Sequence, residues 1–340
     1  MDTLTHTVLG ACLGEAIAGK KLGKKAMLIG ALVNNFPDID VVAQLFTSPA
    51  QGLLVHRGIT HSIFLNLLVS VLLALLFHRL FKKEGLSLKR SALLVSSGLF
   101  LHIFLDALTS YGTGWFEPFD HSRVSLNTLF ILDPLFMLPL LIGAIALLIL
   151  RRDSTKRFSW ARTCLSISLV YLVLTFFIKA IVTNGVQKDL SARNIPHSDF
   201  MTTPGPLSNL LWYTVVKNDK EYYVGYRSLF DSSPVLDYEV ISQNDSLLLP
   251  YRNSQEVQRM LRFSKGYYQV IREDSGLFFS DLRFGQAGGW CGKEAPFVFT
   301  YTIKGPHHAA SLQRGRFKSF KPGVIKGLFA RTMGQKDCGK

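Results

Sequence analysis

The chain has 340 residues, of which 48% are hydrophobic and only 18% are charged, and its mean hydropathy is +0.22. This composition excludes a disordered chain and is atypical of a soluble enzyme, and the length favours two folded parts. The net charge of +14 does not indicate nucleic-acid binding, because it is shared evenly: residues 1–183 hold 17 Lys and Arg against 10 acidic residues, and residues 184–340 hold 21 against 14.

Apolar residues are concentrated in the first 183 positions. Two segments rich in small residues come first, at 4–19 and 26–37, and small residues allow helices to pack closely in a membrane. Four more apolar runs follow, at 62–77, 91–108, 129–150 and 163–183. Each is close to the roughly 20 residues that cross a bilayer, so we predict an all-α membrane bundle of about six transmembrane helices. The N-terminus lacks the basic start of a signal peptide, and we expect none to be cleaved.

Basic residues give this predicted bundle an orientation. Clusters of Lys and Arg lie in the first, third and fifth connections, whereas the loops at 38–61 and 109–128 contain only Arg57 and Arg123. The positive-inside rule then places the basic loops in the cytoplasm and both termini outside. The predicted location is a bacterial-type inner membrane.

From about residue 184 the pattern changes to short aromatic and β-branched segments separated by Gly, Asp, Asn and Pro, which is typical of antiparallel strands and turns. Residues 254–263 form the one helical pattern. We predict a small extracytoplasmic α+β domain at 184–313, followed by a basic, flexible tail at 314–340. Cys291 and Cys338 could pair, since that compartment permits disulfides.

Polar residues of the membrane half are the candidate functional residues, because ionisable groups at membrane depth normally face a bundle interior or a wet cavity. At a rise of about 1.5 Å per residue, four separate helices place such groups about 18–27 Å above their cytoplasmic ends, in one outer layer. The groups are His6, Asp38, Asp40, His56, His61, His102 and Asp106.

Imidazoles and carboxylates together are the ligands of zinc, and they also suit manganese or iron. The predicted metal ligands are His6, Asp38, His56, His61, His102 and Asp106. These exceed the four ligands of one zinc ion, so either more than one ion binds or some residues support the ligands. A metal-activated water would be the nucleophile and Asp40 its base. Arg57 suits a substrate phosphate, or equally pairs with Asp38 or Asp40.

Four motifs occur in order: Asp2-x-x-Thr5-His6, Pro37-Asp38-x-Asp40, His56-Arg57-Gly58-x-Thr60-His61-Ser62 and His102-x-x-x-Asp106. The series resembles the YdjM-like family of membrane-bound, metal-dependent hydrolases over roughly residues 1–140. That family is distantly similar to zinc-dependent phospholipases C and single-strand nucleases, which carry a His-x-x-x-Asp helix. Their further His-x-x-x-Glu helix has no counterpart in this sequence. The resemblance implies a metal site and phosphoester hydrolysis.

The sequence thus predicts a multi-pass membrane hydrolase that cleaves a phosphoester, such as a phospholipid or another amphiphile. Two other functions stay open: a metal-ion carrier whose ligands bind a passing ion, and a non-catalytic membrane anchor for the C-terminal domain. The expected partner is the lipid bilayer, not nucleic acid. The sequence does not indicate the oligomeric state.

Overall fold

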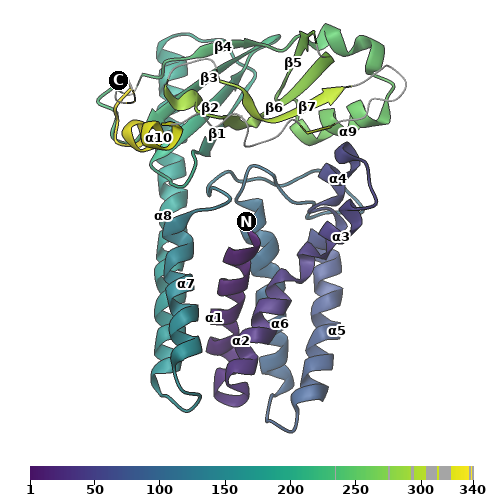
Figure 1. The fold of residues 1–340 in the computed structure, drawn as a ribbon, viewed down its shortest axis with the longest axis vertical. Helices are drawn as coiled ribbons and strands as arrows, with labels where there is room; N and C mark the ends of the chain where they lie inside the picture. The colour runs from purple at the N-terminus through teal and green to yellow at the C-terminus, as the bar shows by residue number, and fades with distance from the viewer. Residues whose placement is uncertain are drawn as a thin grey trace. The chain divides into compact units, whose positions relative to one another are not determined.

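The structure is a computed structural model that describes residues 1–233, 235–274, 276–291, 295–303, 312–313, 323–336 and 338. The chain divides into two compact units. The first comprises Met1–Val42 and His56–Phe176, and the second comprises Ala43–Val55 and Phe177–Lys340. The first unit is helical and the second is rich in strands (Figure 1).

A helical hairpin begins the first unit. Helices α1 (Thr3–Leu22) and α2 (Lys24–Asn35) are joined at Gly23, whose φ of 58° suits a residue without a Cβ. Glycines line the contact between the two helices: a Cβ at Gly10 would lie 2.4 Å from the Gly30 carbonyl oxygen. The small residues therefore allow the close helix packing that the sequence predicts.

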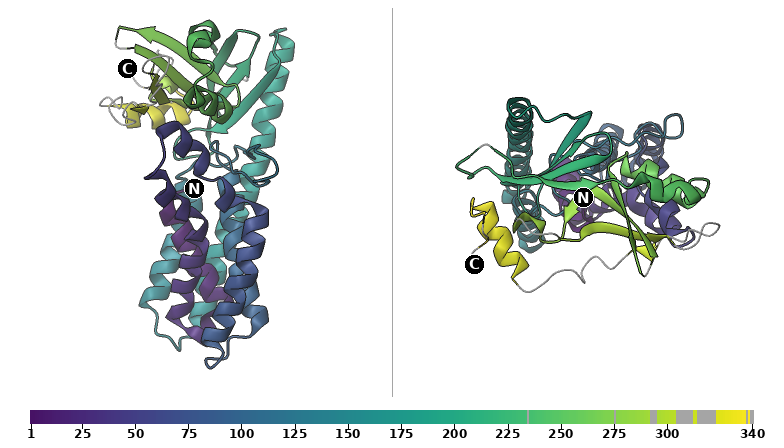
Figure 2. Two further views of the ribbon diagram at one scale, coloured as in Figure 1. Left: turned by 90° about the vertical axis from the view of Figure 1, so that its right-hand side faces the viewer. Right: turned by 90° about the horizontal axis from the view of Figure 1, so that it is seen from above.

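The other helices of the first unit run alongside this hairpin (Figure 2). They are α5 (Ile63–Phe81), α6 (Leu88–Ala107), α7 (Pro134–Ile149) and the first part of α8 (Lys156–Ala192). Helix α1 packs against α2, α6 and α7, while α5 packs against α6. Side chains of Ser62, Ser87 and Asp133 cap α5, α6 and α7 by accepting backbone N–H bonds, so each start is fixed locally.

The prediction of six membrane spans is wrong for the part of the chain that the structure describes. Four helical segments there are long and apolar enough to cross a membrane: Lys24–Gln44, Ile63–Phe81, Leu88–Ala107 and Lys156–Ala192. Helix α1 is continuous, but Glu15 and several glycines interrupt its apolar sequence. Helix α7 has only 16 residues because Asp133 caps its start. Both helices nevertheless contribute to the same buried apolar core.

Short turns connect α2 to α5. They are η1 (Phe36–Ile39), α3 (Asp40–Gln44), α4 (Pro49–Val55) and η2 (Ile59–His61). Residues Ala43–Val55, which the sequence places in the membrane half, belong to the second unit. There the Ser48 hydroxyl donates a 2.7 Å hydrogen bond to Glu256 of helix α9 (Gln255–Ser264).

Two antiparallel four-stranded sheets form the second unit, and the predicted strand-rich domain is confirmed. The first contains β1 (Asp199–Pro204), β2 (Leu211–Lys217), β3 (Glu221–Ser228) and β4 (Glu239–Ser242) in that order. The second contains β5 (Tyr268–Glu273), β6 (Gly276–Gln286), β7 (Phe297–Ile303) and β8 (Leu312–Gln313). Side chains from both sheets, such as Tyr213 and Leu282, share one core. The extracytoplasmic location of this unit stays a prediction.

Part of the segment for which the sequence predicts a flexible tail is folded. Leu328 of helix α10 (Val324–Thr332) packs against two residues. They are Leu211 of the first sheet and Trp290 of the turn η4 (Gly289–Cys291). Cys338 forms a disulfide with Cys291, as the sequence allowed. Residues 314–322 of the predicted tail lie outside the described residues.

Candidate metal centre

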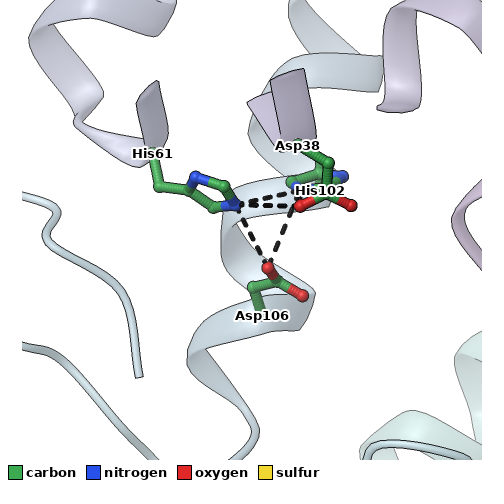
Figure 3. A group of neighbouring side chains, drawn as sticks. All are labelled: Asp38, His61, His102 and Asp106. Carbon is green, nitrogen blue, oxygen red and sulfur yellow. Dashed lines mark hydrogen bonds and ion pairs between the residues drawn. The ribbon is translucent and has the colours of Figure 1, made fainter. Parts of the chain in front are cut away.

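Four predicted ligands converge from three separate elements of the first unit (Figure 3). Turn η1 carries Asp38, turn η2 carries His61, and helix α6 carries both His102 and Asp106. His102 and Asp106 share a face of α6 because they are four residues apart. One ligand atom from each of the four residues lies within 4.8 Å of the others.

The separations between these ligand atoms suit one small divalent cation. His61 Nε2 lies 3.1 Å from His102 Nε2 and 3.2 Å from Asp106 Oδ2. Asp38 Oδ1 lies 3.6 Å from His61 Nε2 and 3.5 Å from His102 Nε2. His102 Nε2 and Asp106 Oδ2 are 3.7 Å apart. Metal–ligand bonds of 2.0–2.1 Å at tetrahedral angles place ligands about 3.3–3.4 Å apart, and the observed distances bracket that value.

The electrostatics of the cluster also favour a cation. His61, His102 and Asp106 are fully buried, and burying carboxylates without compensation is costly. Asp38 Oδ1 is buried but beyond hydrogen-bond distance of both imidazoles. The facing Nε2 atoms of His61 and His102 would repel if both were unprotonated. A divalent cation would resolve all three problems, so the residues present fit a metal ion.

Hydrogen bonds orient the ring of His61 for this role. Its Nδ1 lies 3.0 Å from the Thr60 hydroxyl oxygen and 3.5 Å from Asp40 Oδ2. The Thr60 hydroxyl in turn donates to Asp40 Oδ2 at 2.9 Å. A proton on Nδ1 leaves the Nε2 lone pair directed at the cluster, which is the usual arrangement of a metal-binding histidine.

The buried guanidinium of Arg57 lies against the cluster. Its Nε is 2.7 Å from Asp106 Oδ2, and its other nitrogens donate to the Thr109 hydroxyl at 3.0 Å and to the Met1 carbonyl at 3.1 Å. The sequence suggested pairing with Asp38 or Asp40, but the guanidinium pairs with Asp106. The backbone of Arg57 has a positive φ of 58°, which turns its side chain inward while its N–H donates to Asp40 at 2.7 Å.

His56 and Asp40 form a second feature beside the cluster. His56 Nδ1 donates to Asp40 Oδ1 at 2.9 Å, and the His56 side chain is 20% exposed. Burial lowers the pKa of His56, although the bond to Asp40 opposes this shift. Asp38, Asp40 and His56 also bring ligand atoms within 4.8 Å of one another. Asp38 is common to both groups.

His6 reaches the site through another ligand. Its Nε2 lies 3.1 Å from Asp106 Oδ1, its Nδ1 lies 3.1 Å from Asn34 Oδ1, and its ring stacks on that of His102. The N-terminal amino group of Met1 also contacts Asp106. Both nitrogens of His6 face oxygen acceptors, which suits a residue that positions Asp106, and its role as a direct ligand stays a prediction.

Sequence reasoning missed Asn34, which holds His6 while donating to the Gly98 carbonyl at 3.2 Å. A polar amide within the otherwise apolar pattern of α2 was the available signal. Thr109 begins a Thr-Ser-Tyr-Gly stretch that is typical of the family that this chain resembles, but the sequence did not predict that its hydroxyl accepts from Arg57.

Comparisons with known proteins identify the family of this chain. The family model described as YdjM inner membrane protein matches residues 1–182, a range that includes every predicted ligand. Inner membrane protein YbcI of Escherichia coli (strain K12) is 28% identical over 122 residues, covering 35% of this chain and 69% of that protein. Uncharacterized protein YfhP of Bacillus subtilis (strain 168) is 24% identical over 313 residues, covering 88% of this chain and 90% of that protein. No solved structure matches significantly. The chain belongs to the YdjM inner membrane protein family.

Proposed function

We propose that this inner membrane protein is a metal-dependent hydrolase whose ion is held by Asp38, His61, His102 and Asp106. The observation that carries the proposal is the convergence of their four ligand atoms at separations suited to one tetrahedral ion. Zinc is the proposed ion, because two imidazoles and two carboxylates are ligands that it accepts in that geometry, and manganese or iron are the alternatives. A divalent cation supplies Lewis acidity, which polarises a phosphoryl oxygen and acidifies water.

His56 is the proposed proton acceptor, and Asp40 is its positioning residue. Both oxygens of Asp40 already accept hydrogen bonds, from His56, from the Arg57 backbone and from Thr60. Asp40 thereby fixes the His56 ring and places the Nδ1 proton, which leaves Nε2 as the basic atom. This changes the role predicted for Asp40 from base to support, and that of His56 from ligand to base. Arg57 is likewise a positioning residue, since its guanidinium is taken up by Asp106.

The surroundings of the site favour an amphiphilic phosphoester, such as a phospholipid. Asp38 belongs to the candidate span Lys24–Gln44, and His102 and Asp106 belong to the span Leu88–Ala107. The apolar side chains of Ile39, Ile59 and Phe119 are exposed. Ile39 lies between Asp38 and Asp40 in the chain, and Ile59 immediately precedes Thr60. A substrate with acyl chains would cover such residues while its phosphate reaches the cation.

The test is the metal content of full-length protein purified in detergent. We expect about one zinc ion per chain in the wild type and almost none in His102→Ala or Asp38→Asn. His78→Ala is the matched control, because His78 bonds to the Leu86 carbonyl at the far end of α5. Two ions per chain, reduced to one in His56→Ala, would instead make His56 a ligand.

Hydrolysis is then measured with a phospholipid in mixed micelles and with a soluble phosphodiester. Loss of turnover on metal removal, and its return with zinc, would support the proposal. Metal-free protein with full turnover would refute it. Metal bound without any hydrolysis, together with ion flux in proteoliposomes, would favour the carrier, and the absence of metal and turnover would favour the anchor.

A further inference from the structure

Helix α10 of the second unit presents an uncovered apolar ridge, defined as Ile325, Phe329 and Met333. These side chains are 64%, 61% and 60% exposed. Their four-residue spacing places them on one face of the helix. Phe230, which is 52% exposed, lies close by, because its Cβ is 3.4 Å from the place a Cβ would take at Gly334. Three large apolar side chains of α10 and its C-cap therefore face solvent, and the exposed Phe230 lies beside the end of the helix.

The opposite face of α10 is fixed firmly to the sheets, so the ridge is not a consequence of a loose helix. Arg331 is buried and donates to Asp231 Oδ2 at 2.8 Å and to the Tyr226 carbonyl at 2.9 Å. The Thr332 carbonyl accepts from Ser228, and the disulfide follows at Cys338. These contacts hold the ridge outward in one orientation.

The charge of the surrounding sequence indicates what covers the ridge. Residues 314–340 contain eight Lys and Arg and one acidic residue, Asp337. Two of the basic residues are ion-paired within the unit, Arg331 with Asp231 and Lys336 with Asp237. An apolar, aromatic helix face accompanied by basic residues is the chemistry that binds an anionic lipid surface. A second copy of the chain would bring the same excess of positive charge to the ridge, which opposes a self-contact.

The second unit is also joined to the membrane part through a continuous helix. Helix α8 begins in a candidate membrane span, and its residues Val182, Val186 and Leu190 pack against Trp212 of the first sheet. A bilayer is therefore present at high effective concentration for any lipid-binding surface on this unit.

We propose that the α10 ridge docks onto the anionic headgroup region of the bilayer and seats the second unit on the membrane. Ile325, Phe329 and Met333 would enter the headgroup–acyl boundary, and Lys326 with the basic residues before it would attract anionic lipids. This inference is independent of the proposed hydrolysis, since none of these residues contacts the metal cluster.

The test uses the full-length chain in nanodiscs that contain a photoactivatable phospholipid. One set of nanodiscs contains phosphatidylglycerol and the other only phosphatidylcholine. We expect lipid cross-links on the α10 peptide to be several-fold more abundant with phosphatidylglycerol and to decline at high salt. The Ile325→Glu/Phe329→Glu variant should lose them.

Leu249→Glu is the matched control, because Leu249 is 63% exposed on the separate turn η3 (Asp245–Tyr251) of the same unit. It should keep wild-type cross-linking. Ile325→Ser/Phe329→Ser serves as a milder pair, and each variant is checked for the intact Cys291–Cys338 disulfide. An unlabelled α10, equal labelling in both nanodiscs or in the double variants, or cross-links to a second chain would each overturn the proposal.

Discussion

Arg57 forms a buried ion pair with Asp106, one of the candidate metal ligands, with Nε 2.7 Å from Oδ2. The carboxylate of Asp106 is thus shared between a guanidinium and the proposed cation. The pair determines where Oδ2 lies relative to His61 and His102. We therefore expect Arg57 to influence metal affinity through its contact with Asp106.

We predict that Arg57→Lys weakens zinc binding about 10- to 100-fold, the usual cost of losing a residue that orients a ligand. Lysine keeps the charge, but it lacks the fork that also reaches Thr109 and the Met1 carbonyl. Competition with a chromophoric chelator measures the affinity. Arg90→Lys, an exposed substitution at the start of α6, should leave it unchanged. Equal affinities in all three proteins would contradict this role.

Substitutions of Asp38 and Asp106 should change the unfolding free energy of the metal-free protein by different amounts, although both residues are proposed ligands. Asp106→Asn leaves the buried Arg57 without its partner, and we expect a loss of about 3–5 kcal/mol of unfolding free energy. Asp38 has no Arg or Lys partner among the described residues, so Asp38→Asn should cost little or stabilise the metal-free protein. Unfolding in detergent after chelation measures both. A larger loss for Asp38→Asn would show that the ion pair is unimportant.

The sequence predicted the convergence of the ligands for a physical reason. The spacing of His102 and Asp106 and the common depth of the other groups follow from helix geometry alone. The inward turn of Arg57 could not be predicted, because it depends on a positive φ at one non-glycine residue. The bond between Asp40 and His56 likewise requires the folded turns η1 and η2 and the short helix α3.

The number of membrane spans was predicted wrongly because an apolar run in the sequence does not always coincide with a helix of the same length. Residues 129–150 are apolar as a run, but the carboxylate of Asp133 accepts from Leu135 N–H and starts the helix there. Arg157 is one of the basic residues of the fifth predicted connection, and it is buried against Glu15 instead of being exposed to solvent. A composition rule cannot distinguish a solvated arginine from one that pairs inside the bundle.

That pair between α1 and α8 yields a prediction about stability. Arg157 donates to both Glu15 oxygens, at 2.9 and 2.6 Å, and to the Leu147 carbonyl of α7 at 2.6 Å. Glu15→Gln should lower the unfolding free energy by about 3–5 kcal/mol, because it leaves a buried guanidinium uncompensated. The double variant Glu15→Leu/Arg157→Met should be less destabilised than Glu15→Gln. Zinc content should stay at the wild-type value in both, and its loss would mean that the pair supports the metal site.

The disulfide between Cys291 and Cys338 provides a test of the predicted orientation. If the second unit faces the extracytoplasmic space, as the positive-inside rule predicts, the two cysteines should be oxidised in cells. Quenching intact cells with acid, denaturing the protein and adding a maleimide of high mass should then label only Cys12 and Cys164, the two free cysteines. Reduction before labelling should add two further modifications. Labelling of all four cysteines without prior reduction would place this unit in a reducing compartment and would contradict the predicted extracytoplasmic orientation.

The same disulfide should also stabilise the second unit. Its sequence separation of 47 residues leads us to expect that Cys338→Ser lowers the unfolding free energy by about 4 kcal/mol, measured as unfolding of the second unit in the full chain.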